Sequence, residues 1–108
     1  MSHEIKTLPS GIVIENVPDK YDKYCWYIKG TFFIHNEGEP AFENKNGDKY
    51  WYQHNNEHRL DGPAIEYADD YKIYYIDGLN YSEEEYWNHP KVKEYVYLKE
   101  HPELQGFI

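Results

Sequence analysis

Residues 46–53 read Asn-Gly-Asp-Lys-Tyr-Trp-Tyr-Gln, and residues 69–76, 23 positions later, read Asp-Asp-Tyr-Lys-Ile-Tyr-Tyr-Ile. In both stretches a turn signal leads into β-branched or aromatic residues, which is typical of a strand leaving a tight hairpin turn. Residues 40–43, Pro-Ala-Phe-Glu, match residues 63–66, Pro-Ala-Ile-Glu, at the same offset. An internal period in the twenties indicates stacked supersecondary units. The sequence therefore predicts an antiparallel β-meander of repeats of about 23 residues.

The alternation of side chains along each strand predicts which residues face the core. Three apolar residues at positions taken as equivalent are expected to be buried: Ile14, Phe42 and Ile65. The residues that follow them are expected to face water as a spaced row of charge: Glu15, Glu43 and Glu66. A set containing Trp26, Trp51 and Tyr74 is expected on the face opposite a second set, Tyr27, Tyr52 and Tyr75. The glutamate row and the tyrosine set are both candidate partner-binding surfaces.

The end of the chain has helical signals. Residues 82–85, Ser-Glu-Glu-Glu, form a capping box, which predicts a short helix over about 83–87. Pro90 favours a new helix start, and Pro102 is expected to end that helix. Its apolar face is predicted to comprise Val92, Tyr95, Val96 and Leu98. We therefore expect one mainly β (α+β) domain over residues 1–108, with a repeat body over about 11–81 and a C-terminal helical cap over about 82–101.

Composition narrows the classes of partner and compartment. The chain has 108 residues and a formal net charge of −9, which disfavours direct binding to nucleic acid or to anionic membranes. Cys25 is the only cysteine, so no intrachain disulfide is possible, and this suits a reducing compartment. The first residues lack the pattern of a signal peptide, and no apolar run has membrane-spanning length. These features predict a cytoplasmic protein that does not bind membranes.

Residues 58–64, His-Arg-Leu-Asp-Gly-Pro-Ala, resemble the signature of MORN-variant repeat proteins, which occur in bacteria and in tailed phages of the T4 type. The resemblance covers about residues 23–81, with the motif intact once and eroded to Glu-Gly-Glu-Pro-Ala at residues 37–41. His35-Asn36 stands where the earlier copy would have His-Arg. The resemblance implies a structural or interaction unit, located in the host cytoplasm if a phage encodes it.

The intact motif contains residue types that also occur in active sites, yet its recurrence in such repeats favours a structural turn. In this interpretation Asp61 bonds its own backbone, Gly62 supplies an unusual torsion, and Pro63 begins the next strand. Arg59 is expected to pair with Asp61 or with a carboxylate of a neighbouring repeat. The structural turn motif is thus predicted to comprise His58, Arg59, Asp61, Gly62 and Pro63.

Six histidines raise the question of a metal site. His54, His58 and Glu57, with His35 approaching in space, would suit zinc, although no complete ligand set with a familiar spacing is present. The sequence also contains no Gly-rich phosphate loop and no Gly-x-Ser-x-Gly motif. We therefore predict no catalytic residues, no metal and no cofactor.

The predicted function is a non-catalytic protein–protein binding module whose partner has a basic surface. If a phage encodes the chain, inhibition of a host defence or host enzyme is the expected use. One alternative is an acidic decoy that imitates nucleic acid. Another is a small-molecule-binding protein or an enzyme with a pocket between the sheet and the helices.

Overall fold

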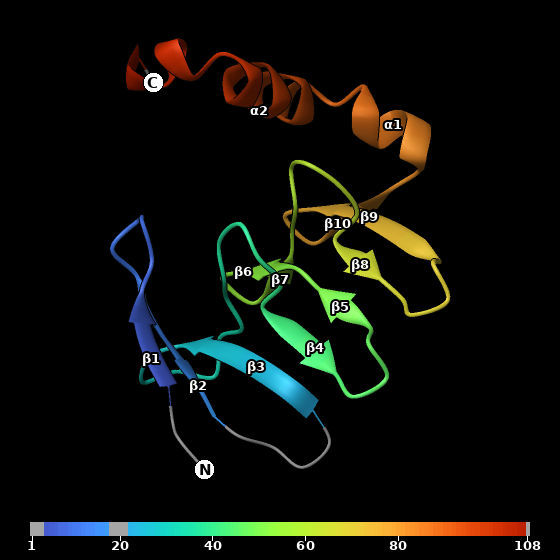
Figure 1. The fold of residues 1–108 in the computed structure, drawn as a ribbon. Helices are drawn as coiled ribbons and strands as arrows, with labels where there is room; N and C mark the ends of the chain where they lie inside the picture. Colours follow the sequence, from blue (N-terminus) through green and yellow to red (C-terminus); the bar gives the residue numbers. More distant parts are fainter. Residues whose placement is uncertain (1–3, 18–21, 108) are drawn as a thin grey trace.

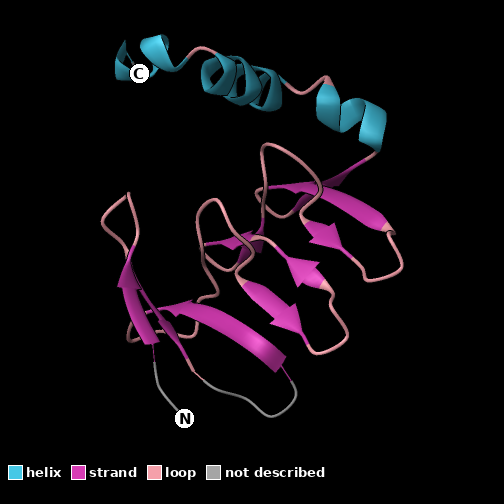
Figure 2. Ribbon diagram, viewed as in Figure 1, coloured by secondary structure: helices cyan, strands magenta, loops and turns pink. Residues whose placement is uncertain are grey.

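A computed structural model describes residues 4–17 and 22–107 of the chain and contains a large antiparallel sheet followed by C-terminal helices (Figure 1). In the described residues, eight strands pair in the order β1-β2-β3-β4-β5-β8-β9-β10, and β6 and β7 form a separate hairpin (Figure 2). The strands are β1 (Glu4–Thr7), β2 (Val13–Asn16), β3 (Asp22–Ile28), β4 (Phe42–Asn44), β5 (Lys49–Tyr50), β6 (Tyr52–Gln53), β7 (Asn56–Glu57), β8 (Ile65–Glu66), β9 (Lys72–Ile76) and β10 (Leu79–Tyr81).

The strand order confirms the predicted mainly β meander. Turns occur where the sequence signals them, with positive φ angles at Gly47, Asn55, Asp70 and Gly78. The sheet begins earlier than the predicted repeat body, because β1 pairs with all four residues of β2. The strand β1 was not predicted, because Glu4–Thr7 matches no repeat unit.

Two successive repeats form the same backbone hydrogen bonds. The Trp26 amide donates to the Ala41 carbonyl at 2.7 Å, and the Trp51 amide donates to the Ala64 carbonyl at 2.7 Å. The amides of His35 and His58 donate in turn to the carbonyls of Trp26 and Trp51, each at 3.0 Å. Trp26 and Trp51 are therefore structurally equivalent, and so are His35 and His58.

Cross-strand partners point to the same side of an antiparallel sheet, so the register defines two faces. One face, called here the helix-side face, carries Trp26, Tyr24, Glu43, Lys49, Glu66 and Tyr74. The opposite face, called here the open face, carries Cys25, Tyr27, Phe42, Tyr50, Ile65 and Tyr75. The predicted separation of Trp26 and Tyr74 from Tyr27 and Tyr75 agrees with this register.

The predicted equivalence of Ile14 with Phe42 and Ile65 is wrong. Ile14 pairs with Ile28, which places it on the helix-side face, whereas Phe42 and Ile65 lie on the open face. The sequence alignment of these residues is displaced by an odd number of positions, and such a displacement moves a side chain to the other face. Ile14 and Ile65 are nevertheless buried as predicted, while Phe42 is half-buried.

The helices are α1 (Glu83–Trp87), α2 (Pro90–Glu100) and the 3-10 helix η1 (Pro102–Phe107), and they follow one another along one side of the sheet (Figure 1). The predicted capping box is confirmed, because Ser82 and Glu85 exchange both of its hydrogen bonds. Pro90 begins α2 as predicted, but Tyr95, which was assigned to its apolar face, is 40% exposed. None of the helices in the described part of the chain is long and apolar enough to cross a membrane.

Two small cores hold the molecule together. The first joins Tyr74 and Ile76 of β9 to Tyr86 and Val92 of the helices. The second joins Leu8, Ile14 and Trp26 near the first strands. The helices contribute Tyr86 and Val92 to the first core, whereas the second core is built from the first strands and the segment between them.

Candidate functional site

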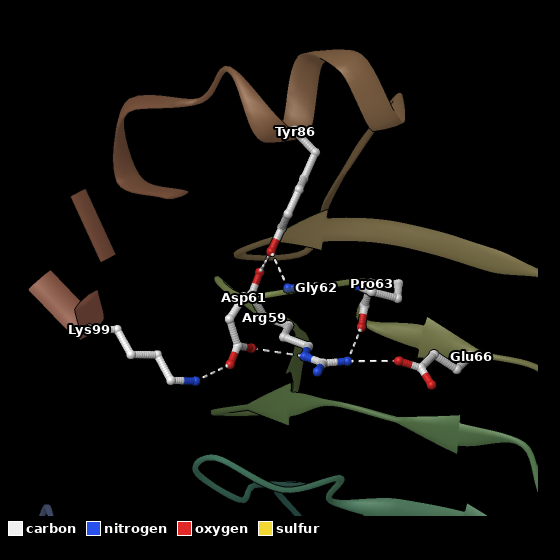
Figure 3. A network of polar contacts seen from close by, with 7 residues as sticks. All are labelled: Arg59, Asp61, Gly62, Pro63, Glu66, Tyr86 and Lys99. Atoms are coloured by element: carbon white, nitrogen blue, oxygen red, sulfur yellow. Dashed lines mark hydrogen bonds and ion pairs between the residues drawn. The ribbon is translucent and has the colours of Figure 1, made fainter. Parts of the chain in front are cut away.

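The intact motif organises its surroundings around the guanidinium of Arg59 (Figure 3). Its Nε donates to Asp61 at 2.9 Å, and its Nη1 donates to the Pro63 carbonyl at 3.1 Å and to Glu66 at 2.9 Å. The guanidinium carbon also lies 3.9 Å from the centre of the Trp51 ring, which is a cation–π contact. Arg59 thus pairs with both predicted kinds of carboxylate, one within the motif and one on the neighbouring strand.

The same motif receives the helical cap (Figure 3). The Tyr86 hydroxyl donates to the Arg59 carbonyl at 2.6 Å and accepts from the Gly62 amide at 3.1 Å. Lys99 of α2 pairs with Asp61 at 2.8 Å. Burial alone would raise the pKa of Asp61, but hydrogen bonds from Lys99 and Arg59 outweigh it and hold this pKa below its ordinary value. The motif is therefore the anchor of the C-terminal helices.

The predicted role of Gly62 is wrong in its mechanism. Gly62 does not have the left-handed torsion that other glycines in the described residues adopt. A Cβ at position 62 would lie 2.8 Å from the guanidinium carbon of Arg59, so a larger residue there would displace this side chain from its contacts with Asp61 and Glu66. The carboxylate of Asp61, expected to bond its own backbone, is directed instead to Arg59 and Lys99.

The histidines of the two repeats fasten hairpin turns. Nδ1 of His58 accepts from the amide of Asp77 at 2.9 Å, and Nδ1 of His35 accepts from the amide of His54 at 2.9 Å. The two donors, Asp77 and His54, have positive φ angles of 50° and 48°. Each imidazole therefore stabilises a strained turn in the following repeat.

The zinc alternative receives no support from these positions. His35 also contacts Glu37 through Nε2 at 2.8 Å, so both of its ring nitrogens are engaged. Within residues 4–17 and 22–107, no three His, Cys, Asp or Glu side chains come together as a metal site would require. Cys25 is buried and unbridged.

We expect His58 to make stability depend on pH. Burial lowers the pKa of His58, against the opposing effect of the Asp77 carboxylate, and nearby Lys91 lowers it further. The unfolded state therefore binds the proton more readily, so the free energy of unfolding should fall as pH decreases below about 6.5. Between about pH 7 and pH 5, the free energy of unfolding, measured by urea denaturation, should change less with pH for His58→Gln than for the wild type. An unchanged dependence in the variant would contradict this role.

The predicted row of water-facing glutamates is broken. Glu15 pairs with Tyr27 on the open face and accepts from the Gly30 amide at 2.8 Å. Glu43 and Glu66 lie on the helix-side face, and Glu43 is only 8% exposed. Lys23 approaches the carboxylate of Glu43 at 3.3 Å. The expectation that Glu43 is exposed to water is wrong, because its side chain lies in a concave region that it lines together with Tyr24 and Pro40.

Aromatic rings gather on the open face. Phe42 and Tyr50 have ring centres 5.0 Å apart, and Tyr50 meets Tyr67 at 6.3 Å. Tyr52 of the adjoining β6–β7 hairpin follows Tyr50 by two positions, and burial raises the pKa of its hydroxyl. The aromatic patch is defined here as Tyr27, Phe42, Tyr50, Tyr52 and Tyr75. Sequence reasoning identified the tyrosines at 27, 52 and 75 but missed Phe42 and Tyr50, whose face depends on strand register.

Two concave regions lie on the helix-side face. A groove of about 490 Å³ beside Trp26 is lined by Tyr24, Asn36, Pro40 and Glu43, among others. A smaller cavity of about 230 Å³ lies between the motif and Tyr95 of α2. The smaller one is where the alternative pocket between sheet and helices was expected, and its volume is below the usual range for ligand sites, about 300–1,000 Å³.

Comparisons with protein-family models, with curated proteins and with solved structures find no match to this chain.

Proposed function

We propose that the chain is a non-catalytic protein–protein binding module that docks through the aromatic patch. The observation that carries this proposal is a set of half-buried aromatic residues, of which Tyr27, Phe42, Tyr50 and Tyr75 lie on the sheet face opposite the one that packs against the helices, with Tyr52 on the adjoining hairpin. Tyrosine is enriched in interfaces because its ring buries a large area at low entropic cost while its hydroxyl still forms hydrogen bonds.

The resemblance of residues 58–64 to phage and bacterial repeat proteins extends the proposal. The partner would be a host protein of the cytoplasm, and binding would inhibit a host defence or host enzyme. The acidic decoy is less well supported, because Glu15 lies on the opposite face from Glu43 and Glu66. A protein that imitates nucleic acid needs negative charges spaced in a row along one surface, as phosphates are.

The test compares capture of partners by two matched variants. Tyr52→Ala with Tyr75→Ala removes two rings of the aromatic patch, whereas Tyr95→Ala with Tyr97→Ala removes two exposed rings of α2. A partner captured from a bacterial lysate and then purified should bind the patch variant at least about 30-fold more weakly, since interface tyrosines commonly contribute about 2 kcal/mol or more. Circular dichroism checks that both variants are folded.

The α2 variant should retain wild-type affinity. Equal affinity of the patch variant and the wild type would contradict docking through this face. Loss of binding in the α2 variant alone would place the interface on the helices instead.

A further inference from the structure

The groove beside Trp26 lies where the next repeat holds an arginine. In the second repeat, Arg59 lies over Trp51, donates to the carbonyl of Pro63 and pairs with Glu66. The first repeat keeps the corresponding groups, namely Trp26, Pro40 and Glu43. All three line the groove of about 490 Å³. The position of Arg59 itself is taken by Asn36, which follows His35 as Arg59 follows His58.

Asn36 reproduces only one of the arginine's contacts. Its Nδ2 donates to the Pro40 carbonyl at 3.1 Å, the same distance at which Arg59 donates to Pro63. An amide side chain is several atoms shorter than a guanidinium side chain. No hydrogen bond or ring contact of the described residues joins Asn36 to Trp26 or to Glu43. The first repeat therefore has the receptor groups for an arginine without the arginine.

Two lysines show that these receptor groups attract cations. Lys6 lies 4.4 Å from the centre of the Trp26 ring, and Lys23 lies 3.3 Å from the carboxylate of Glu43. The Lys23 side chain is 64% exposed, so it reaches Glu43 from the rim of the groove. Neither ammonium unites the ring and the carboxylate as the planar guanidinium of Arg59 does in the second repeat.

The buried carboxylate makes the groove more than a surface depression. Glu43 is 8% exposed, and its neighbour Tyr24 has a pKa raised to about 12, first by burial and then by the Glu43 carboxylate. A carboxylate with so little access to water gains more from a charged donor than an exposed one does. Glu39, which corresponds to Gly62 of the second repeat, lines the same groove and pairs with Lys6 at 3.8 Å.

We propose that this groove binds an arginine side chain of a protein partner, whose guanidinium displaces the Lys6 ammonium from the accessible edge of Trp26 and pairs with Glu43. That a protein supplies the arginine rests on the proposed function, whereas the guanidinium site stands on the internal comparison of the two repeats. The groove would give the partner's arginine an anionic binding site on the helix-side face, separate from the aromatic patch.

The experiment titrates the full chain with Nα-acetyl-argininamide and follows backbone and indole resonances by NMR. We expect saturable shifts for the Trp26 indole and for residues 36–43, and no such shifts for the Trp51 indole, which Arg59 already covers. The neutral isostere Nα-acetyl-citrullinamide should bind at least about tenfold more weakly, because it lacks the charge.

Two variants locate the site. Glu43→Gln should weaken binding of argininamide at least about tenfold, while Glu15→Gln, on the opposite face, should leave it unchanged. Asn36→Arg should fill the groove from within, as in the second repeat, and abolish binding. If Asn36→Arg does not fold, Glu43→Gln still decides the matter.

Absence of saturable shifts in the wild type would overturn the proposal. So would equal affinity for the citrulline compound, or unchanged affinity in Glu43→Gln. Because the probe is a small molecule, these results would leave docking through the aromatic patch standing. Conversely, a failure of the patch variant to lose its partner would not affect the arginine site.

Discussion

Replacing Tyr86 by Ala is expected to lower the free energy of unfolding by about 3–5 kcal/mol. Tyr86 is fully buried, and its ring lies 4.7 Å from that of Tyr74 in the core between β9 and the helices. Its hydroxyl also satisfies the Arg59 carbonyl and the Gly62 amide. Truncation would therefore leave a cavity and two unpaired backbone groups. Urea denaturation followed by circular dichroism measures the change.

A milder variant separates the two contributions. Tyr86→Phe keeps the ring and removes only the hydroxyl, so a loss of about 1–3 kcal/mol is expected. Tyr97→Ala, on a residue of α2 that is 53% exposed, should cost less than about 1 kcal/mol. A loss at Tyr97 as large as that at Tyr86 would mean that the cap is held by other contacts than those to the motif.

Replacing Ile14 by Ala is the second change with a large expected effect, about 2–5 kcal/mol. Ile14 has no exposed surface and packs with Leu8 and Trp26 in the core of the first strands. The matched control is Ile5→Ala on the neighbouring strand β1, because Ile5 is 52% exposed and pairs with Glu15 rather than with Ile14. We expect the control to remain within about 0.5 kcal/mol of the wild type.

The comparison tests the corrected assignment of faces. If Ile5→Ala proved costlier than Ile14→Ala, β2 would present its opposite face to the core, and Glu15 would join Glu43 on one side of the sheet. Thermal denaturation of the two variants under identical conditions measures the difference.

Local chemistry made the helices and the turns predictable. The capping box depends only on Ser82 and Glu85, three residues apart, and α1 has the predicted bounds, Glu83–Trp87. Pro90 begins α2 because its ring already holds the helical φ angle and its missing amide would have no partner there. Gly47 and Gly78 adopt positive φ in hairpin turns, as their Asn-Gly and Asp-Gly contexts indicate.

Contacts between distant segments limited the prediction of the candidate site. Glu43 is 8% exposed and lines a groove together with its cross-strand partner Tyr24 and with Pro40, so its exposure depends on segments beyond its own strand. The close approach at position 62 is to the guanidinium of Arg59, which contacts Trp51 and Glu66. The arginine site proposed beside Trp26 depends on the matching hydrogen bonds of the two repeats, which the sequence alone does not show.

The sequence by itself determined the class of fold, the period of the repeats, most turns and both helix starts, because each depends on residues within a few positions of one another. Only the tertiary structure decided which face each strand presents, as the reversed side of Ile14 and Glu15 shows. Register is set by pairing between strands far apart in the chain, and a shift by one residue exchanges the two faces. The same pairing decided which glutamates are buried and where an arginine would fit.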